Sequence, residues 1–362
     1  MPTIYVAITN HGFGHATRTA AVVAEIQRQQ PETRIIIATT APLDLLQSYI
    51  PGDFVYHRRS FDVGVVQRDS IQMDRPATLA KMNQIWQEQA QIIAAEAEFI
   101  QANHVDLIFA DIPPLVTAIA QAAGVTCWMA GNFGWDFIYR DWGAAYGAEY
   151  IELADRVADL YGKCDRLFRL PFAEPMASFS NAKIEDVGLT GGTPRYDAAT
   201  LRQRFGLEPD RQTILLTFGG LGLSEIPYHN LAKFPERQFI TFDRHAPDLP
   251  NLLQIKEQSE QLRPVDMMVV CDRIVSKPGY STLAESLRVG LPVICMTRDG
   301  FVEAQTLIAG VQDYAEHVII SPQDFYAGDW QFLNAPLQPP RCSEQLDLHG
   351  EVAIAQTIIA AL

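Results

Sequence analysis

The stretch Ser276-Lys277-Pro278-Gly279-Tyr280-Ser281-Thr282-Leu283-Ala284-Glu285 has the form of a turn that leads into a helix. Pro278 and Gly279 favour the turn, and apolar residues at helical spacing follow it. The first turn of a helix presents unpaired N–H groups and the positive end of the helix dipole, which suit a diphosphate. Lys277 adds a positive charge, and Glu285 is placed to accept hydrogen bonds from two sugar hydroxyls. The stretch predicts a diphosphate site, with an ordinary capped helix that binds nothing as the alternative.

Length and composition indicate a globular chain of about two domains. The 362 residues are 48% hydrophobic, which is enough for two packed cores. A net charge of −15, from 28 basic and 43 acidic residues, argues against a nucleic-acid surface. The five cysteines have no metal-ligand spacing and are expected to be reduced thiols. No signal peptide or membrane-spanning stretch is recognised, so we expect a cytoplasmic protein, free or peripheral to a membrane, with no metal and no cofactor.

A strand, a glycine loop and a helix form the first predicted unit, with the strand at residues 3–8 and the loop at residues 10–15. A dinucleotide-binding fingerprint is disfavoured because Thr17 stands at the third glycine position. Gly14 allows a ligand to approach the backbone closely, and His15 and Arg18 share one face of the first helical turn. His15 is the candidate general base, since a helix N-terminus favours the neutral imidazole.

Two alternatives to a catalytic His15 stay open at this stage. His15 could merely pack or hydrogen-bond the loop, and His11 could be the base or contact the acceptor. The βαβα pattern of the first half predicts a parallel sheet, whose ligands gather at the carboxyl ends of the strands. Asp111 follows one such strand and could orient His15, cap the helix that begins near Pro113, or do both. Trp135 and Asp136 are candidate acceptor contacts along with His11, Gly14 and Arg18.

A segment rich in proline and glycine, residues 170–196, predicts the connection between two domains. The expected division is an N-terminal acceptor-binding domain at 1–190, a C-terminal nucleotide-sugar-binding domain at 191–345, and a C-terminal helix at 346–362 that packs back on the N-terminal domain. A second glycine loop, Gly219-Gly220-Leu221-Gly222, follows a strand and could approach the diphosphate. A plain tight turn is its alternative.

Residues 279–285, the following Gly290-Leu291-Pro292-Val293, and the later Glu303 and Gln305 together resemble the donor site of GT-B glycosyltransferases. The resemblance implies an α/β fold of the GT-B type, with two Rossmann-like domains facing an inter-domain cleft. It also implies phosphate ligands at Lys277, Ser281 and Thr282 and a ribose-binding carboxylate at Glu285. Glu303 and Gln305 would hold the sugar hydroxyls, although their spacing is looser than usual here.

Three segments together, residues 12–18, 132–139 and 276–285, look like the glycosyltransferase-like N-terminal portion of L-arabinokinases. No kinase phosphate loop follows residue 305, so we expect a stand-alone transferase-like unit. The resemblance to GT-B transferases implies that His15, assisted by Asp111, is the base of an inverting transfer.

The resulting hypothesis is metal-independent, inverting transfer of a sugar from a nucleotide sugar, expected to be UDP-linked, to the hydroxyl of an unidentified small-molecule or lipid acceptor. A nucleotide-sugar 2-epimerase of the same fold and a non-catalytic nucleotide-sugar-binding or regulatory protein are the alternatives. The predicted donor ligands are Gly219, Gly220, Lys277, Gly279, Ser281, Thr282, Glu285, Glu303 and Gln305.

Overall fold

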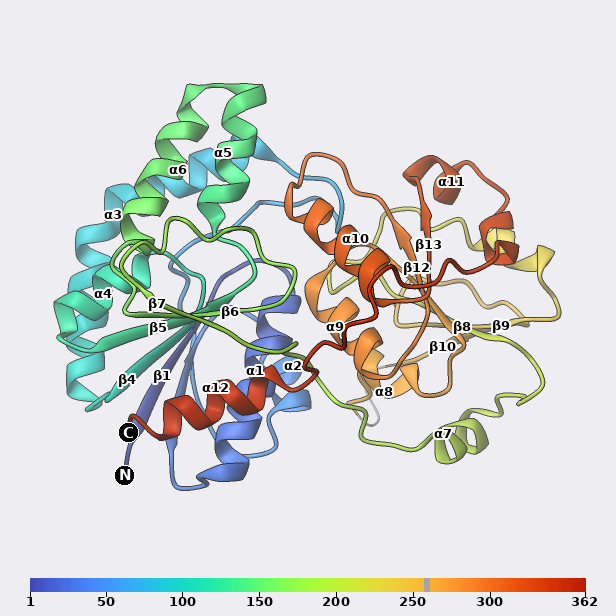
Figure 1. Ribbon diagram of the computed structural model, residues 1–362, viewed down its shortest axis with the longest axis horizontal. Helices are drawn as coiled ribbons and strands as arrows, with labels where there is room; N and C mark the ends of the chain where they lie inside the picture. The colour runs from blue at the N-terminus through green and yellow to red at the C-terminus, as the bar shows by residue number, and fades with distance from the viewer. Residues whose placement is uncertain (257–260) are drawn as a thin grey trace.

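Two parallel α/β units lie side by side in the computed structural model, which describes residues 1–256 and 261–362 (Figure 1). The first sheet has seven strands in the order β3-β2-β1-β4-β5-β6-β7. Its central strands are largely apolar and buried, as β2 shows with Ile35, Ile36 and Ile37, because helices cover both faces of a parallel sheet, whereas the edge strands β3 and β7 are more exposed. The strands are β1 Thr3–Ile8, β2 Arg34–Ala38, β3 Val55–His57, β4 Leu107–Asp111, β5 Thr126–Gly131, β6 Arg166–Arg169 and β7 Lys183–Asp186.

Six helices belong to this first unit: α1 Gly14–Gln29, α2 Leu43–Tyr49, α3 Arg75–Ala102, α4 Leu115–Ala123, α5 Trp135–Tyr146 and α6 Ala148–Tyr161. In Figure 1, helices α3 to α6 lie above the sheet, and α1 and α2 lie below it. The long helix α3 begins at Arg75 because Asp74 caps it by accepting from the N–H of Ala77.

The second sheet has six parallel strands in the order β10-β9-β8-β11-β12-β13. The strands are β8 Thr213–Leu216, β9 Gln238–Thr241, β10 Leu252–Gln254, β11 Arg273–Ser276, β12 Val293–Met296 and β13 His317–Ile320. The helices of this half are α7 Ala198–Phe205, α8 Pro264–Met268, α9 Tyr280–Arg288, α10 Glu303–Tyr314 and α11 Pro322–Tyr326, with 3₁₀ turns η1 Tyr228–Lys233 and η3 Gln331–Asn334.

Both sheets reverse their strand order at one point, between β1 and β4 in the first and between β8 and β11 in the second. The loops after these strands diverge to opposite sides, which opens a crevice at the carboxyl ends where ligands bind in such sheets. The first reversal holds the loop before α1 and Asp111 at the end of β4. The second holds the loop after β8 and the turn between β11 and α9. The fold therefore places both predicted sites at the two reversal points.

The final helix, α12 (Gly350–Ile359), packs against α1 of the first unit, and the two chain ends lie close together in Figure 1. Its first turn is tied to the second unit by Arg288 of α9, whose guanidinium donates to Glu351 at 2.8 Å and to the carbonyl of Gly191 at 2.5 Å. One hydrophobic cluster includes residues of α1, α12, α9 and both sheets, so the two units share buried surface. In the part of the chain that the structure describes, no helix is both long and apolar enough to cross a membrane.

Candidate functional site

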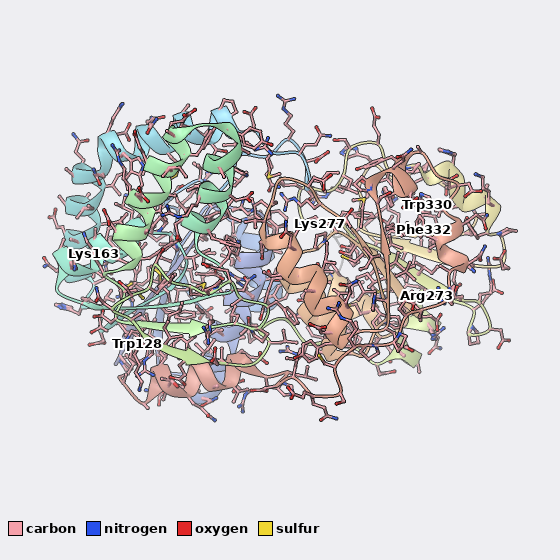
Figure 2. All side chains as sticks on the ribbon, turned by 45° about the horizontal axis from the view of Figure 1, so that its top comes forward. Trp128, Lys163, Arg273, Lys277, Trp330 and Phe332 are labelled. Carbon is pink, nitrogen blue, oxygen red and sulfur yellow. The ribbon has the colours of Figure 1, made fainter. Side chains whose placement is uncertain are left out.

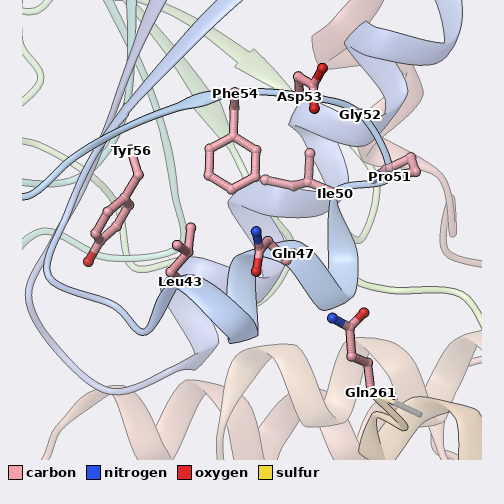
Figure 3. A pocket seen from close by; sticks show the side chains of 9 residues that line it. All are labelled: Leu43, Gln47, Ile50, Pro51, Gly52, Asp53, Phe54, Tyr56 and Gln261. Atoms are coloured by element: carbon pink, nitrogen blue, oxygen red, sulfur yellow. The ribbon is translucent and has the colours of Figure 1, made fainter.

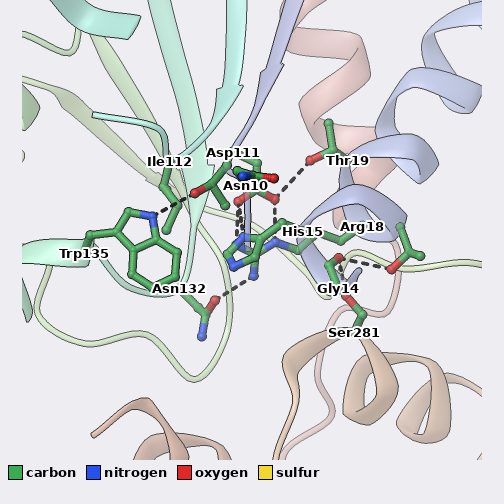
Figure 4. A network of polar contacts seen from close by, with 12 residues as sticks. Asn10, Gly14, His15, Arg18, Thr19, Asp111, Ile112, Asn132, Trp135 and Ser281 are labelled. Atoms are coloured by element: carbon green, nitrogen blue, oxygen red, sulfur yellow. Dashed lines mark hydrogen bonds and ion pairs between the residues drawn. The ribbon is translucent and has the colours of Figure 1, made fainter. Parts of the chain in front are cut away.

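The carboxylate of Asp111 gathers side chains from the first turn of α1 (Figure 4). It accepts from Nδ1 of His15 at 2.8 Å and from Nε and Nη2 of Arg18 at 2.6 and 2.7 Å, with the Thr19 hydroxyl 3.0 Å away. The α4 helix has no side-chain cap, so the alternative role of Asp111 as a helix cap is wrong. The expected hydrogen bond between Asp111 and His15 is present.

The geometry around Asp111 selects one tautomer of His15. An ionised carboxylate only accepts hydrogen bonds, so in the neutral form of His15 the proton lies on Nδ1 and Nε2 keeps its lone pair. The 3.1 Å approach of Arg18 Nη2 to His15 Nδ1 is then the contact of two donors that share one acceptor. His15 thus has the form that a general base requires.

Arg18 is buried against Asp111 and keeps the pKa of this carboxyl below its usual range, against the effect of burial, which would raise it. The guanidinium also donates from Nη1 to the amide oxygen of Asn132 at 2.7 Å. The amide nitrogen of Asn132 in turn donates to Glu303 of the second unit at 2.8 Å. A continuous chain of polar contacts therefore connects the candidate base with one predicted sugar ligand.

His11 lies beside His15, with the two ring centroids 6.0 Å apart. Burial, followed by the nearby His15, Arg298 and Lys277, lowers the pKa of His11 well below its ordinary value. Its Nδ1 lies 3.1 Å from the carbonyl oxygen of Val65. His11 is consequently neutral and a weaker candidate for the base than His15.

On the other side of the cleft, α9 begins at Tyr280 after an extended Gly279, and no side chain caps its first N–H groups. The Ser281 hydroxyl donates instead to the carbonyl of Gly14 at 2.7 Å. It therefore connects the two units, and its proton is not free for the predicted phosphate contact. Thr282 is half-buried beside it. The free N–H groups of this first turn remain suited to an anion.

Lys277 lies between the two units in the middle of the molecule (Figure 2). Its Cε lies 3.4 Å from the position that a Cβ on Gly219 would occupy, and its Nζ is 3.5 Å from the corresponding position on Gly279. Gly219 has a φ of +82°, which a side chain would strain. Burial and then the charge of Arg298 lower the pKa of Lys277 to about 8. The Lys277 cation, the glycine loop at Gly219 and the start of α9 thus lie next to one another, at the predicted diphosphate site.

Glu285 is buried on α9, where its Oε1 accepts from the N–H of Gly192 at 3.0 Å and from the Tyr49 hydroxyl at 3.3 Å. Burial raises the pKa of this carboxyl to about 7, although both hydrogen bonds oppose the shift. Its position behind the first turn of α9 is compatible with the predicted ribose contact, which stays a prediction.

Some predicted acceptor contacts lie elsewhere. Trp135 is wholly buried and donates from Nε1 to the Thr9 hydroxyl at 2.9 Å. Asp136 is also buried and accepts from the Ser178 hydroxyl at 2.5 Å. Arg18 uses its guanidinium on Asp111 and Asn132. The structure contradicts the prediction that these three side chains contact an acceptor, because packing and internal hydrogen bonds occupy them.

The remaining predicted ligands differ in their exposure. Glu303 is buried at the cleft, whereas Gln305 is exposed on α10 and none of its side-chain atoms has a hydrogen-bond partner in the described part of the chain. Gly220 lies directly under the ring of Phe13, since a Cβ at this position would come within 1.9 Å of that ring. The glycine loop therefore closes on the first unit through Phe13.

A cavity of about 220 Å³ adjoins the His11 loop at the carboxyl ends of β1 and β2. Its lining includes Asn10, His11, Thr40 and Leu221, the last of which comes from the second unit. A larger hollow of about 440 Å³ beside α2 contains none of the predicted site residues (Figure 3). The smaller cavity is therefore the one that adjoins the predicted site, through His11, whose ring is the neighbour of His15.

Sequence reasoning missed Asn132, Arg298 and Phe301. Arg298 is buried in the loop after β12, and its guanidinium lies 4.0 Å over the ring of Phe301. A charged residue directly after an apolar strand of a parallel sheet was the available signal, since such positions face the ligand crevice. Among the described residues, no group of histidine, cysteine and carboxylate side chains could hold a metal ion.

Comparison with known structures decides the fold. The chain superposes on Medicago truncatula UGT71G1 in complex with UDP-glucose with a TM-score of 0.60, at 12% identity, covering 99% of this chain and 94% of that one. The fold is GT-B. The expected pair of Rossmann-like domains is thus confirmed. A putative UDP-N-acetylglucosamine 2-epimerase from Listeria monocytogenes has the same fold, with a TM-score of 0.58, 14% identity and coverage of 100% and 96%.

The resemblance to L-arabinokinases is also confirmed. The L-arabinokinase of Arabidopsis thaliana is 28% identical over 355 residues, which cover 96% of this chain. The chain spans 33%, about a third, of the length of that relative. No protein-family model matches the chain.

Proposed function

We propose that this GT-B chain transfers a sugar from a nucleotide sugar, most simply a UDP-sugar, to an acceptor hydroxyl with inversion at the anomeric carbon. The observation that carries the proposal is the pairing of two features across one cleft. The His15–Asp111 pair stands at the strand reversal of the first sheet, and Lys277 with the start of α9 stands at that of the second. One supplies a base and the other an anion site.

In the proposed reaction, Nε2 of His15 takes the proton of the acceptor hydroxyl as its oxygen attacks the anomeric carbon. The bond between that carbon and the diphosphate oxygen breaks, and the nucleoside diphosphate leaves with the electron pair. Asp111 holds the imidazole in the required tautomer and stabilises the imidazolium that forms. The cavity of about 220 Å³ beside His11 favours a small acceptor group at this point.

Negative charge grows on the leaving diphosphate during the transfer. Lys277, the free N–H groups of the first α9 turn and the backbone of the Gly219 loop are the groups that would stabilise it. These groups could do so without a metal ion. The relative UGT71G1 was solved with UDP-glucose, which supports a nucleotide-sugar donor for this chain.

The epimerase alternative has one specific observation in its favour, the shared fold of the Listeria monocytogenes protein. An epimerase would convert the nucleotide sugar without an acceptor. The His15–Asp111–Arg18 cluster instead orients a single base, and His11 beside it lines a cavity that can hold part of a second substrate. We therefore prefer transfer to an acceptor.

The donor site predicts a specific pH dependence of nucleotide-sugar affinity. Lys277 has a pKa of about 8 in the unliganded protein, and a bound diphosphate favours its charged form. The contribution of Lys277 to affinity should be constant below pH 8 and fall by up to about tenfold for each pH unit above it, as binding then requires uptake of a proton. Calorimetric titration of a UDP-sugar between about pH 7 and 9.5 measures this.

The matched control is Lys277→Arg, which keeps its charge throughout this range. The variant should bind with an affinity that does not change between about pH 7 and 9.5. A wild-type profile without a decline above pH 8, or the same decline in the variant, would mean that Lys277 is not a diphosphate ligand.

A further inference from the structure

Arg298 has an unusual set of contacts for a buried cation. It is 7% exposed, and neither its Nε nor its Nη2 has a hydrogen-bond partner. Among the described residues, no other side chain has two buried polar atoms without a partner. Buried N–H groups are almost always hydrogen-bonded, because an unpaired one loses its contacts with water and gains none in return. A pair of such donors on one guanidinium therefore indicates a ligand.

Nε and Nη2 form one edge of the guanidinium. Two other arginines of this protein use the same edge to bind a carboxylate. Arg18 contacts the two carboxylate oxygens of Asp111 through Nε and Nη2, at 2.6 and 2.7 Å. Arg169 contacts Asp186 through the same two atoms, at 2.6 and 2.9 Å. Two parallel N–H groups match the spacing of carboxylate oxygens. The unpaired edge of Arg298 has the geometry of a carboxylate site.

The surroundings of Arg298 hold the guanidinium in place at the cleft. Its guanidinium carbon lies 4.0 Å from the centroid of the Phe301 ring. That ring also contacts His11, nearly parallel to it with centroids 5.9 Å apart, and Phe133, with centroids 6.2 Å apart. This stacking fixes the plane while its edge stays free. Arg298 therefore stands between the donor groups of the second unit and the histidines of the first.

Two cations and two carboxylates lie close to one another around Arg298. Burial and then the charge of Arg298 lower the pKa of Lys277, and burial lowers the pKa of Arg298 to about 10. The nearby carboxylates are Glu303, which accepts from Asn132, and Asp69, which accepts from the Ser224 hydroxyl. An anion beside Arg298 would offset the mutual repulsion of the two cations.

We propose that the Nε and Nη2 edge of Arg298 binds a carboxylate on the transferred sugar, so that the donor is a nucleotide-linked uronic acid. This inference rests on the proposed function, because it assumes that the sugar lies between the diphosphate and His15. Lys277 and the α9 turn already provide for the diphosphate. Arg298 lies in the loop after the neighbouring strand β12 and packs on Phe301, whose ring stacks on His11 of the first unit. This position toward the first unit suits the sugar.

The test compares the affinities of UDP, UDP-glucose and UDP-glucuronate for the wild-type protein, with no acceptor present. Hydrogen bonds to a charged partner contribute about 1.5–3 kcal/mol, so UDP-glucuronate should bind about 10- to 100-fold more tightly than UDP-glucose. Arg298→Gln should remove this preference and leave the affinity for UDP unchanged. Arg341→Gln, which removes an exposed arginine paired with Asp313, is the matched control and should keep the preference.

Each other outcome contradicts the inference in a different way. Equal binding of the two sugar nucleotides, with UDP bound, overturns the carboxylate site and leaves the proposed function standing. A loss of UDP affinity in Arg298→Gln would make Arg298 a diphosphate ligand instead. If neither UDP nor its sugars bind to the wild-type protein, the proposed UDP-sugar donor fails together with this inference. Because no acceptor is present, a preference cannot come from an acidic acceptor.

Discussion

Asp111→Asn should reduce the free energy of unfolding by about 3–5 kcal/mol, the largest stability effect that we expect of any single substitution in the cleft. The carboxylate is 2% exposed and is the counter-charge of Arg18, which is 3% exposed. An amide at this position leaves the guanidinium buried without an anion and turns an N–H group toward other donors. Chemical unfolding followed by tryptophan fluorescence measures the difference.

Asp186→Asn provides a matched control for that prediction. Arg169 binds Asp186 through the same two nitrogen atoms, but the carboxylate is 71% exposed. An exposed pair contributes at most about 1 kcal/mol, so the control should change stability little. In the Asp111→Asn background, Arg18→Met should restore part of the loss, since it removes the unpaired charge. Equal effects of Asp111→Asn and Asp186→Asn would contradict the account of the cluster.

His15→Ala should lower the turnover number for sugar transfer by about 10²–10⁴-fold, the range for a general base. Nucleotide-sugar affinity should stay unchanged, because His15 belongs to the first unit and the proposed diphosphate ligands belong to the second. Steady-state kinetics with calorimetric measurement of donor binding separates the two quantities. The expected loss is therefore confined to the chemical step.

His11→Ala is the matched variant, since the two rings are neighbours with centroids 6.0 Å apart. The pKa of His11 is well below the ordinary value, so this imidazole is a poor proton acceptor and its loss should cost less. A larger loss in His11→Ala than in His15→Ala would assign the base to His11. A loss of donor affinity in His15→Ala would end the proposed division of roles between the two domains.

The sequence predicted those parts of the fold that depend on local patterns. Buried β-rich runs such as residues 34–38 alternate with helices, which predicts a parallel sheet before any strand order is known. Asp111 and His15 could be paired in advance because both follow neighbouring strands at the same sheet edge. Chain length and the proline- and glycine-rich segment 170–196 predicted a second domain, and the resemblance to GT-B transferases implied its Rossmann-like fold.

Sequence patterns did not predict which way the side chains point. Trp135 was predicted to contact an acceptor, yet it begins α5 and its indole N–H donates to the Thr9 hydroxyl within the core. The hydroxyl of Ser281 has the position of a phosphate ligand, but its partner is Gly14, 267 residues away. The three-dimensional arrangement alone shows that Arg298 has two unpaired donors. Contacts between distant segments decide all three cases.

The release of UDP from a UDP-sugar in excess chelator, with and without a panel of small hydroxylated acceptors, tests the central claim most directly. The account predicts release that depends on an acceptor and is undiminished by the chelator, since Lys277 and the α9 turn stabilise the leaving group. Release that requires a divalent metal would contradict the account of the leaving group. Conversion of the UDP-sugar to its epimer without any acceptor would contradict transfer itself.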